Sequence, residues 1–241
     1  MSGRITMLKI LRVALLLPLL SLGACSVNEV ITAEESELIV AADAKDEALL
    51  LDVGIIEFDA GVPEDNDPER SRVYDDIRNA ESRYLAYHLK STMQGTGHWG
   101  AVRVLPSENA FTDVIVNGRI EKSDGEFVDI RIDVSDTSGQ HWYTKNYEMQ
   151  TGISSYSESR DRRLDPYQKV FNDIANDLHA FSETLPQEFF RRLQQISELK
   201  FFADMSPLAY GEHLSEDEDG LITINRLPAE NDPAVDRLRQ I

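Results

Sequence analysis

Two runs of alternating apolar residues constrain the fold of this chain more than any other feature. Apolar side chains recur at about every second position in Val114–Ile120 and again in Val128–Val134. The pair Asp124-Gly125 lies between them, and an Asp-Gly pair between two such runs is the strongest short-range signal for a β-hairpin. A second turn over 136–139 leads into a third strand, Trp142–Met149. The sequence therefore predicts a three-stranded antiparallel meander.

Two further strands and a long helix are expected before the meander. The nearly continuous apolar run Leu50–Phe58 is typical of a strand covered on both faces, which places it inside a sheet. Trp99–Leu105 is a second strand candidate. Between them, Glu69–Met93 has helical periodicity and ends near Gly95 and Gly97. The apolar face expected for this helix consists of Val73, Ile77, Ala80, Tyr84 and Tyr87.

Two helices are expected after the meander. One begins at Asp165-Pro166 and carries apolar residues through Phe181, and another begins at Pro186. The pattern weakens beyond about 207, although Asp232-Pro233 has the form of a helix start. The order of elements predicts an α+β fold, with a mixed sheet containing the three-stranded antiparallel meander and helices covering it.

The first 24 residues have the composition of an export leader. Arg4, Lys9 and Arg12 form a basic start without an acid, and the apolar run Val13–Leu22 has the length of a signal-peptide core. A membrane-spanning helix needs about 20 apolar residues, and this run is shorter. The sequence therefore predicts export rather than a membrane span.

The leader ends in Leu22-Gly23-Ala24-Cys25, which contains the only cysteine of the chain. This run resembles the bacterial lipoprotein signal. The resemblance implies cleavage between Ala24 and Cys25, a diacylglycerol thioether on Cys25 and usually a third acyl chain, such as palmitate, on the new amino terminus. At about 0.8 kcal/mol per buried CH₂, two or three acyl chains anchor a protein stably. The alternative is a chance cysteine in a leader that is removed or left uncleaved.

The residue after the cysteine bears on the membrane to which such a protein goes. In Gram-negative lipoproteins an aspartate at this position tends to retain the protein in the inner membrane, and this chain has Ser26 there. The resemblance therefore implies the periplasmic face of the outer membrane.

The remaining chain is strongly acidic. The formal net charge is −19, and the leader contributes three basic residues and no acid, so the part after it carries about −22. An acidic surface repels phosphate backbones, which disfavours nucleic-acid binding. The expected organisation is a signal peptide over 1–24, an acidic tether over 25–49 with a possible helix near 34–44, an α+β domain over 50–200, and an acidic, weakly structured extension over 201–241.

The pattern between Leu50 and Met149 resembles a small periplasmic domain found in several envelope proteins. These are the curli-secretion lipoprotein, the lipoprotein activators of penicillin-binding proteins and the amino-terminal part of the Tol-system propeller protein. The residues that carry the resemblance are Val53–Phe58, Val102–Leu105, Val116–Ile120, Asp136–Gly139 and Trp142. The resemblance implies an interaction module that helps to assemble envelope machinery and that supplies no catalytic residues.

The sequence shows no metal or cofactor motif. The histidines are scattered without metal-ligand spacing, so neither zinc nor a cofactor is expected. Ser215–Arg226 has Asp217, Asp219 and Gly220 at calcium-loop positions, but Arg226 stands where such a loop requires a glutamate. No nucleophile elbow or phosphate-binding glycine loop is present, so no catalytic residue is assigned.

Two groups of residues are candidate partner contacts. Tyr143 and Tyr147 lie on the last meander strand, where tyrosines suit an interface, whereas core packing is the preferred interpretation for Trp142. The second group is a local basic spot in an acidic chain and consists of Arg160, Arg162 and Arg163.

Three functional hypotheses follow. The favoured one is a non-catalytic outer-membrane lipoprotein, held in the bilayer through Cys25, that binds another cell-envelope protein. The second is a lipid-anchored envelope hydrolase without a recognisable motif, and the third is a calcium-dependent structural lipoprotein.

Overall fold

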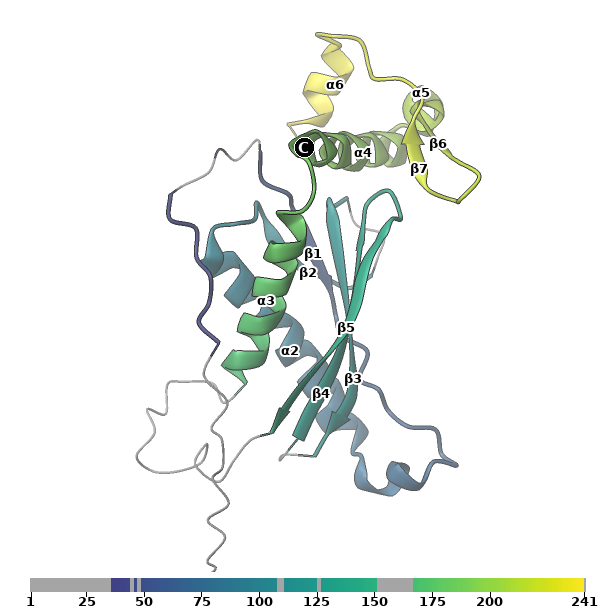
Figure 1. Ribbon diagram of the computed structural model, residues 1–241. Coiled ribbons are helices and arrows are strands. Elements are labelled where there is room, and N and C mark those ends of the chain that lie inside the picture. The colour runs from purple at the N-terminus through teal and green to yellow at the C-terminus, as the bar shows by residue number, and fades with distance from the viewer. Residues whose placement is uncertain are drawn as a thin grey trace, which may run out of the picture. The chain divides into compact units, whose positions relative to one another are not determined.

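The computed structural model describes residues 36–43, 46, 49–107, 111–124, 127–150 and 167–240. Its main sheet has the strand order β2-β1-β3-β4-β5 (Figure 1). The strands are β1 (Val53–Ile56), β2 (Val102–Leu105), β3 (Val114–Ser123), β4 (Phe127–Asp136) and β5 (His141–Gln150). The interior strand β1 is parallel to both neighbours, whereas β3, β4 and β5 form the antiparallel meander. The predicted meander and the interior position of the first strand are confirmed.

Helices cover one face of this sheet, which confirms the predicted α+β class. The described part of the chain contains the α-helices α2 (Asp75–Thr96), α3 (Gln168–Ser182), α4 (Gln187–Met205), α5 (Pro207–Tyr210) and α6 (Pro233–Leu238). It also contains the short 3-10 helices η2 (Pro68–Arg72) and η4 (Gly211–His213). Both α2 and α3 pack on the sheet, α2 along β1 and β2 and α3 along β5 (Figure 1).

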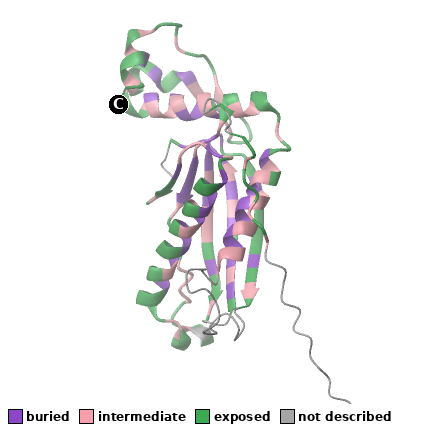
Figure 2. Cartoon of the chain, turned by 90° about the vertical axis from the view of Figure 1, so that its left-hand side faces the viewer, coloured by how far each residue is buried: buried purple, intermediate pink, exposed green. Residues whose placement is uncertain are grey.

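The core lies between the sheet and these two helices. Alternate residues of β4, including Ile130 and Ile132, are fully buried, and their neighbours are more exposed. Buried positions recur along the strands of the main sheet in Figure 2. The antiparallel register places Ile130 opposite Tyr147 and Val134 opposite Tyr143 on the same helix-covered face. Because successive side chains of a strand point to opposite faces, the other face of the meander carries polar residues such as Arg131.

The apolar face predicted for the long helix is wrong. Ile77, Tyr84 and Tyr87 are exposed by 57%, 44% and 61%, whereas a different stripe of α2 faces the core. That stripe is Leu85, Ala86, Leu89 and Met93, accompanied by small polar residues. The helix has two apolar stripes, and the smaller side chains of the second one pack closely against the sheet. Arg78 of the same helix is buried, and its Nε lies 3.9 Å from Glu81 Oε2.

The limits of this helix also differ from the expectation. A 3-10 turn occupies 68–72, and the α-helix begins only at Asp75. Its end agrees with the expectation that glycine stops it, because Gly97 adopts φ 70°, a left-handed conformation that glycine tolerates without a steric cost.

Helix α4 is fixed to the end of the sheet and continues past the expected boundary at residue 200. Gln194 donates to the carbonyl of Leu50 at 2.9 Å, and Lys200 donates to the carbonyl of Thr137 at 2.7 Å. Burial lowers the pKa of Lys200.

The segment after α4, expected to be weakly structured, contains ordered elements. A hairpin of β6 (Leu214–Glu216) and β7 (Ile222–Ile224) is followed by α6, and Asp232 caps α6 by accepting from the amide of Ala234 at 2.8 Å. The predicted helix start at Asp232-Pro233 is thus confirmed. A small apolar cluster joins these elements to α4 and consists of Leu199, Phe202, Tyr210 and Val235.

Candidate functional site

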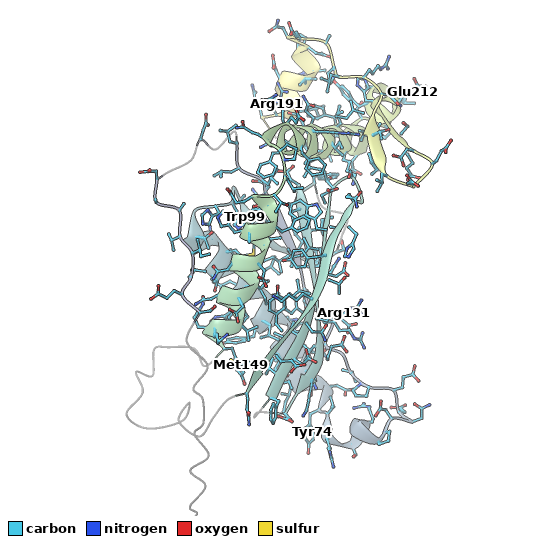
Figure 3. The ribbon with its side chains drawn as sticks, viewed as in Figure 1. Tyr74, Trp99, Arg131, Met149, Arg191 and Glu212 are labelled. Carbon is cyan, nitrogen blue, oxygen red and sulfur yellow. The ribbon has the colours of Figure 1, made fainter. Side chains whose placement is uncertain are left out.

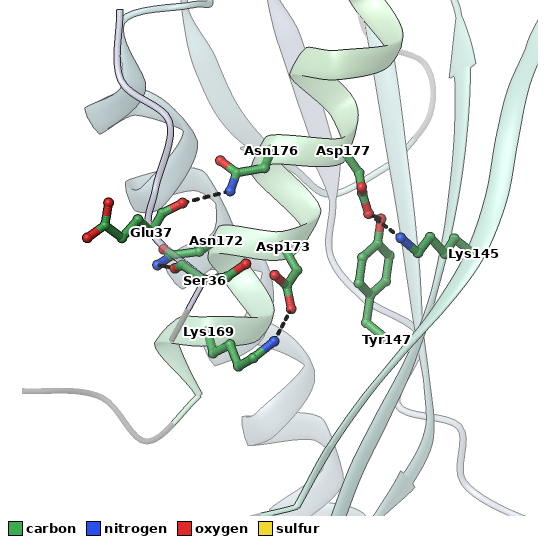
Figure 4. A network of polar contacts seen from close by, with 9 residues as sticks. All are labelled: Ser36, Glu37, Lys145, Tyr147, Lys169, Asn172, Asp173, Asn176 and Asp177. Carbon is green, nitrogen blue, oxygen red and sulfur yellow. Dashed lines mark hydrogen bonds and ion pairs between the residues drawn. The ribbon is translucent and has the colours of Figure 1, made fainter. Parts of the chain in front are cut away.

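A polar groove lies between β5 and α3, and the described segment 36–43 borders it. Its volume is about 310 Å³. The residues that line it are Ser36, Lys145, Asn146, Tyr147, Glu148, Asp173, Asn176 and Asp177. They include three carboxylates and one ammonium group, so the lining carries a negative excess. Figure 4 shows how side chains of β5 and α3 point toward one another across it.

Asp177 joins the helix to the strand. Its Oδ2 accepts from Lys145 Nζ at 2.6 Å and from the Tyr147 hydroxyl at 2.8 Å (Figure 4). Burial raises the pKa of Tyr147, and so does donation of its proton to a carboxylate, because both favour the neutral phenol. Since Tyr147 is only 5% exposed, it presents little of its ring to a partner. Its hydroxyl instead fixes the wall of the groove.

The other aromatic residues of β5 pack against the end of α3. The ring of Tyr143 lies 5.5 Å from that of Phe181, and burial raises the pKa of its phenol. Trp142 stacks on Phe181 at 5.1 Å and donates from Nε1 to Asp136 at 2.9 Å. Trp142 is 8% exposed, which agrees with its interpretation as a core residue.

The polar face of α3 holds segment 36–43, which we call the strap. Asn172 donates to the carbonyl of Ser36 at 2.8 Å. Asn176 donates to the carbonyl of Glu37 and accepts from the amide of Ile39, each at 2.9 Å (Figure 4). An amide side chain that both donates and accepts can pair with an extended backbone as a neighbouring strand does. Across its eight described residues the strap contains no helix.

The sequence pattern did not identify these α3 residues as members of a site. Asn172, Asp173, Asn176 and Asp177 recur at helical spacing opposite a strong apolar face, which ordinarily indicates only a solvated surface. The available signal was the pair of asparagines one turn apart, together with apolar Leu38, which packs against the core.

Several predicted site residues lie outside the described residues. These are Ala24 and Cys25 of the lipoprotein signal and Arg160, Arg162 and Arg163 of the basic spot. The structure therefore brings Tyr143 and Tyr147 to the β5–α3 contact and leaves the other candidates as predictions from sequence.

A second polar cluster lies at the junction of α4 with the sheet. Asp113 is 5% exposed, accepts from the Ser197 hydroxyl at 2.6 Å and accepts from the amide of Asp52 at 2.8 Å. Burial raises the pKa of Asp113 from 3.8 to about 6, although both hydrogen bonds oppose the rise. Each partner belongs to a different part of the chain, so this cluster acts as a structural lock between α4 and the sheet.

The calcium-loop resemblance corresponds to the turn of the β6–β7 hairpin. The Asp217 carboxylate there accepts from the amides of Asp219 and Leu221 at 3.0 and 2.9 Å, as in an Asx turn. Among the described residues no group of three or more His, Cys, Asp or Glu side chains is arranged to hold a metal ion. His88 stacks on Phe171 with ring centroids 5.6 Å apart. None of the described helices combines the length and apolarity that a bilayer crossing requires.

Comparison with known proteins gives little further information. No protein-family model and no curated protein matches the chain. Among solved structures, the chain is similar to a dodecamer of a PelC variant from Paraburkholderia phytofirmans, with 16% identity and a TM-score of 0.28. The match covers 65% of this chain and 92% of that one.

Proposed function

We propose that this chain is a lipoprotein anchored through Cys25 to the periplasmic face of the outer membrane, where it acts as a non-catalytic interaction or assembly module of the cell envelope. The run Leu22-Gly23-Ala24-Cys25 supports the anchor. The observation that carries the interaction role is the edge of β5, a ten-residue strand with a paired neighbour on one side among the described strands. A strand edge presents backbone donors and acceptors to which an extended segment of another protein can add.

The groove beside this edge supports recognition of a particular kind of segment. Lys145 and Glu148 on β5 disfavour pairing with an identical copy, because charged side chains on an edge strand oppose uncontrolled association. Asp173 is paired with Lys169 at 2.8 Å and Asp177 with Lys145 at 2.6 Å, so Glu148 supplies the negative charge beside the strand edge. The partner segment we propose is therefore extended and polar, with at least one basic side chain near Glu148.

Site-specific crosslinking in intact cells tests the interaction. A photo-crosslinking amino acid at Asn146, which is exposed on β5, is expected to give one discrete adduct with an envelope protein. The matched control is the same amino acid at Arg191, which is exposed on α4 (Figure 3). Glu148→Lys is expected to reduce the Asn146 adduct by reversing the local charge. Equal adducts at both positions, or none at Asn146, would contradict the proposal.

The anchor and the catalytic alternative have separate tests. Intact mass of the mature protein is expected to show an acylated amino-terminal cysteine, and Cys25→Ser is expected to release the protein into the aqueous fraction. Turnover of an envelope substrate by the purified protein would favour the lipid-anchored hydrolase instead.

A further inference from the structure

The apolar stripe of α2 that the sequence predicts as its core face lies on the surface instead. Ile77, Tyr84 and Tyr87 are exposed by 57%, 44% and 61%, and Ala80 between them is exposed as well. At about 100° per residue, these four positions fall within an arc of about 80° on one side of the helix. We call this group the α2 stripe.

The α2 stripe faces away from the core. The buried residues Leu89 and Met93 lie roughly opposite it around the helix axis and face the sheet. Helix α3 packs beside α2 rather than over the stripe, through the stacking of Phe171 on His88 at 5.6 Å. The four side chains are therefore accessible to a partner.

The composition of the α2 stripe suits a protein partner. Tyrosines are enriched in protein interfaces, because a large ring adds contact area at a low cost in side-chain entropy. Neighbouring side chains support both rings: the ring of Tyr84 lies 4.2 Å from that of His88, and Lys90 Nζ lies 5.7 Å from the centroid of the Tyr87 ring. Contiguous exposed apolar side chains on one helix mark an interaction surface more often than a solvated face.

The spacing of the α2 stripe is symmetric about residue 82. Ile77 and Tyr87 lie five positions to either side of this point, and Ala80 and Tyr84 lie two positions to either side. In an antiparallel pair of helices related by a two-fold axis at residue 82, Ile77 of each copy lies opposite Tyr87 of the other. The small Ala80 then makes room for the ring of Tyr84. The stripe is therefore complementary to a second copy of itself.

The charges along one flank of the stripe are complementary in the same arrangement. Asp76 and Lys90 lie on the same flank, six positions before and eight positions after residue 82. The two-fold axis brings equal flanks together, so Asp76 of one copy lies within about 3 Å, along the helix axis, of the level of Lys90 of the other. Arg83 faces its own counterpart near the axis, and its charge is offset within each copy by Glu57 at 2.6 Å.

The acidity of the chain limits the strength of such a contact. Each copy has a formal net charge of −19, which opposes association. At physiological ionic strength the Debye length is about 8 Å, so distant charges are largely screened while close opposite charges still attract. From Asp76 to Lys90 the helix rises only about 21 Å, and a contact of this length is at the low end of specific interfaces. We expect dissociation in the micromolar range.

We propose that the α2 stripe is a homodimer interface, in which α2 of one copy packs antiparallel on α2 of a second copy. This inference goes beyond the proposed function and does not depend on the lipid anchor. Helix α2 lies along β1 and β2, whereas the edge proposed for partner binding belongs to β5 at the other side of the sheet. A dimer through α2 therefore leaves both β5 edges accessible.

Sedimentation equilibrium of the full mature chain tests the dimer. The purified protein is measured in a mild, density-matched detergent at physiological ionic strength, through the micromolar range of concentration, and wild type is expected to shift from monomer to dimer. Ile77→Asp is expected to weaken the dimer at least about tenfold, because it places a charge within the apolar contact. The matched control is Leu208→Asp, which adds the same charge at a fully exposed position of α5 and is expected to change the dissociation constant by less than about twofold.

A charge exchange tests the antiparallel arrangement. Asp76→Lys and Lys90→Asp, each made alone, place like charges near each other and are expected to weaken the dimer about tenfold. The double variant restores opposite charges and is expected to return to within about threefold of wild type. Net charge alone predicts a different result, because Asp76→Lys makes each copy less acidic and would then strengthen the dimer. The fluorescence of the buried Trp99 and Trp142 checks that each variant is folded.

Four results would overturn the inference. Wild type that stays monomeric through the micromolar range would exclude the dimer, and association unchanged by Ile77→Asp would place the contact on another surface. A double variant as weak as the two single variants would refute the antiparallel register. A photo-crosslinking amino acid at Ile77 that gives, in intact cells, an adduct with another envelope protein and none with a second copy would assign the stripe to that protein. None of these results bears on Cys25 or on the β5 edge, so the proposed function is tested separately.

Discussion

Replacing Asp113 with asparagine is expected to stabilise the protein at neutral pH and to leave its stability almost unchanged in acid. Asp113 is buried at the junction of α4 with the sheet, and its pKa is raised from 3.8 to about 6, mainly by desolvation. The nearby like charge of Asp52 adds to this rise. Above pH 6 the folded protein therefore carries a buried carboxylate that the unfolded chain ionises more easily.

The size of the effect follows from the two pKa values. At about 1.36 kcal/mol for each unit of pKa, the rise from 3.8 to about 6 corresponds to about 3 kcal/mol. Because the folded pKa is the higher one, this stability is fully present below pH 3.8 and is lost as the pH rises through 6. An asparagine at this position can accept from the amide of Asp52 and donate to the Ser197 hydroxyl, so it keeps both contacts. We therefore expect Asp113→Asn to be more stable by up to about 3 kcal/mol at pH 7.5 and nearly equal to wild type at pH 4.

Urea unfolding followed by the fluorescence of Trp99 and Trp142, which are both buried, measures this difference. The quantity to compare is the free energy of unfolding of the variant minus that of wild type, at intervals from pH 4 to 7.5. Ser197→Ala provides a matched test, because it removes a hydrogen bond that lowers the pKa of Asp113 and should shift the transition to higher pH. A difference that does not change with pH, or a loss of stability for Asp113→Asn at pH 7.5, would refute the reasoning.

Three further predictions concern the strap, the groove and the sheet. Asn176→Ala should leave the amide of Ile39 without its side-chain acceptor, and hydrogen exchange at that amide should become faster while the sheet amides remain protected. Tyr147→Phe should cost about 1 kcal/mol in urea unfolding, because the α3 carboxylate loses one donor and keeps its lysine partner. Gly118→Ala should cost roughly 1–3 kcal/mol, because a Cβ there would meet the buried ring of Phe58 closer than van der Waals contact allows, and thermal unfolding measures the loss.

Each of these expectations has a contradicting result. Unchanged exchange at the amide of Ile39 would show that packing alone holds the strap. A Tyr147→Phe variant as stable as wild type would remove the phenol from the contacts that fix the groove. For Gly118→Ala, an unchanged melting temperature would mean that the ring of Phe58 can shift without loss.

The local elements were predictable because their signals are local. The alternation in β3, β4 and β5 records which side chains point to the core, and the turn residues between them fix the antiparallel connection. The capped start at Asp232 similarly identified α6 from a few neighbouring residues. These features need no information from distant parts of the chain.

Features that depend on distant contacts could not be predicted in the same way. The strap was expected to be part of a free tether because the asparagines that hold it lie about 136–139 positions away in the sequence. The groove is assembled from β5, α3 and the strap, and no single motif describes it. For Asp113, the sequence contains only a carboxylate before a strand, and burial beside Ser197 of α4 gives it a raised pKa.

Helix α2 separates most clearly what the sequence determined from what the tertiary structure decided. The sequence by itself determined that a long helix would lie between the first two strands and end at Gly97, since periodicity and the glycine stop act within a few turns. The sequence of this helix contains two apolar stripes, one with Ile77, Tyr84 and Tyr87 and one with Leu85 and Leu89. Only the packing of the sheet and α3 decided that the second stripe would be buried, because close contact between layers favours side chains that fit the opposing surface over those that are merely large.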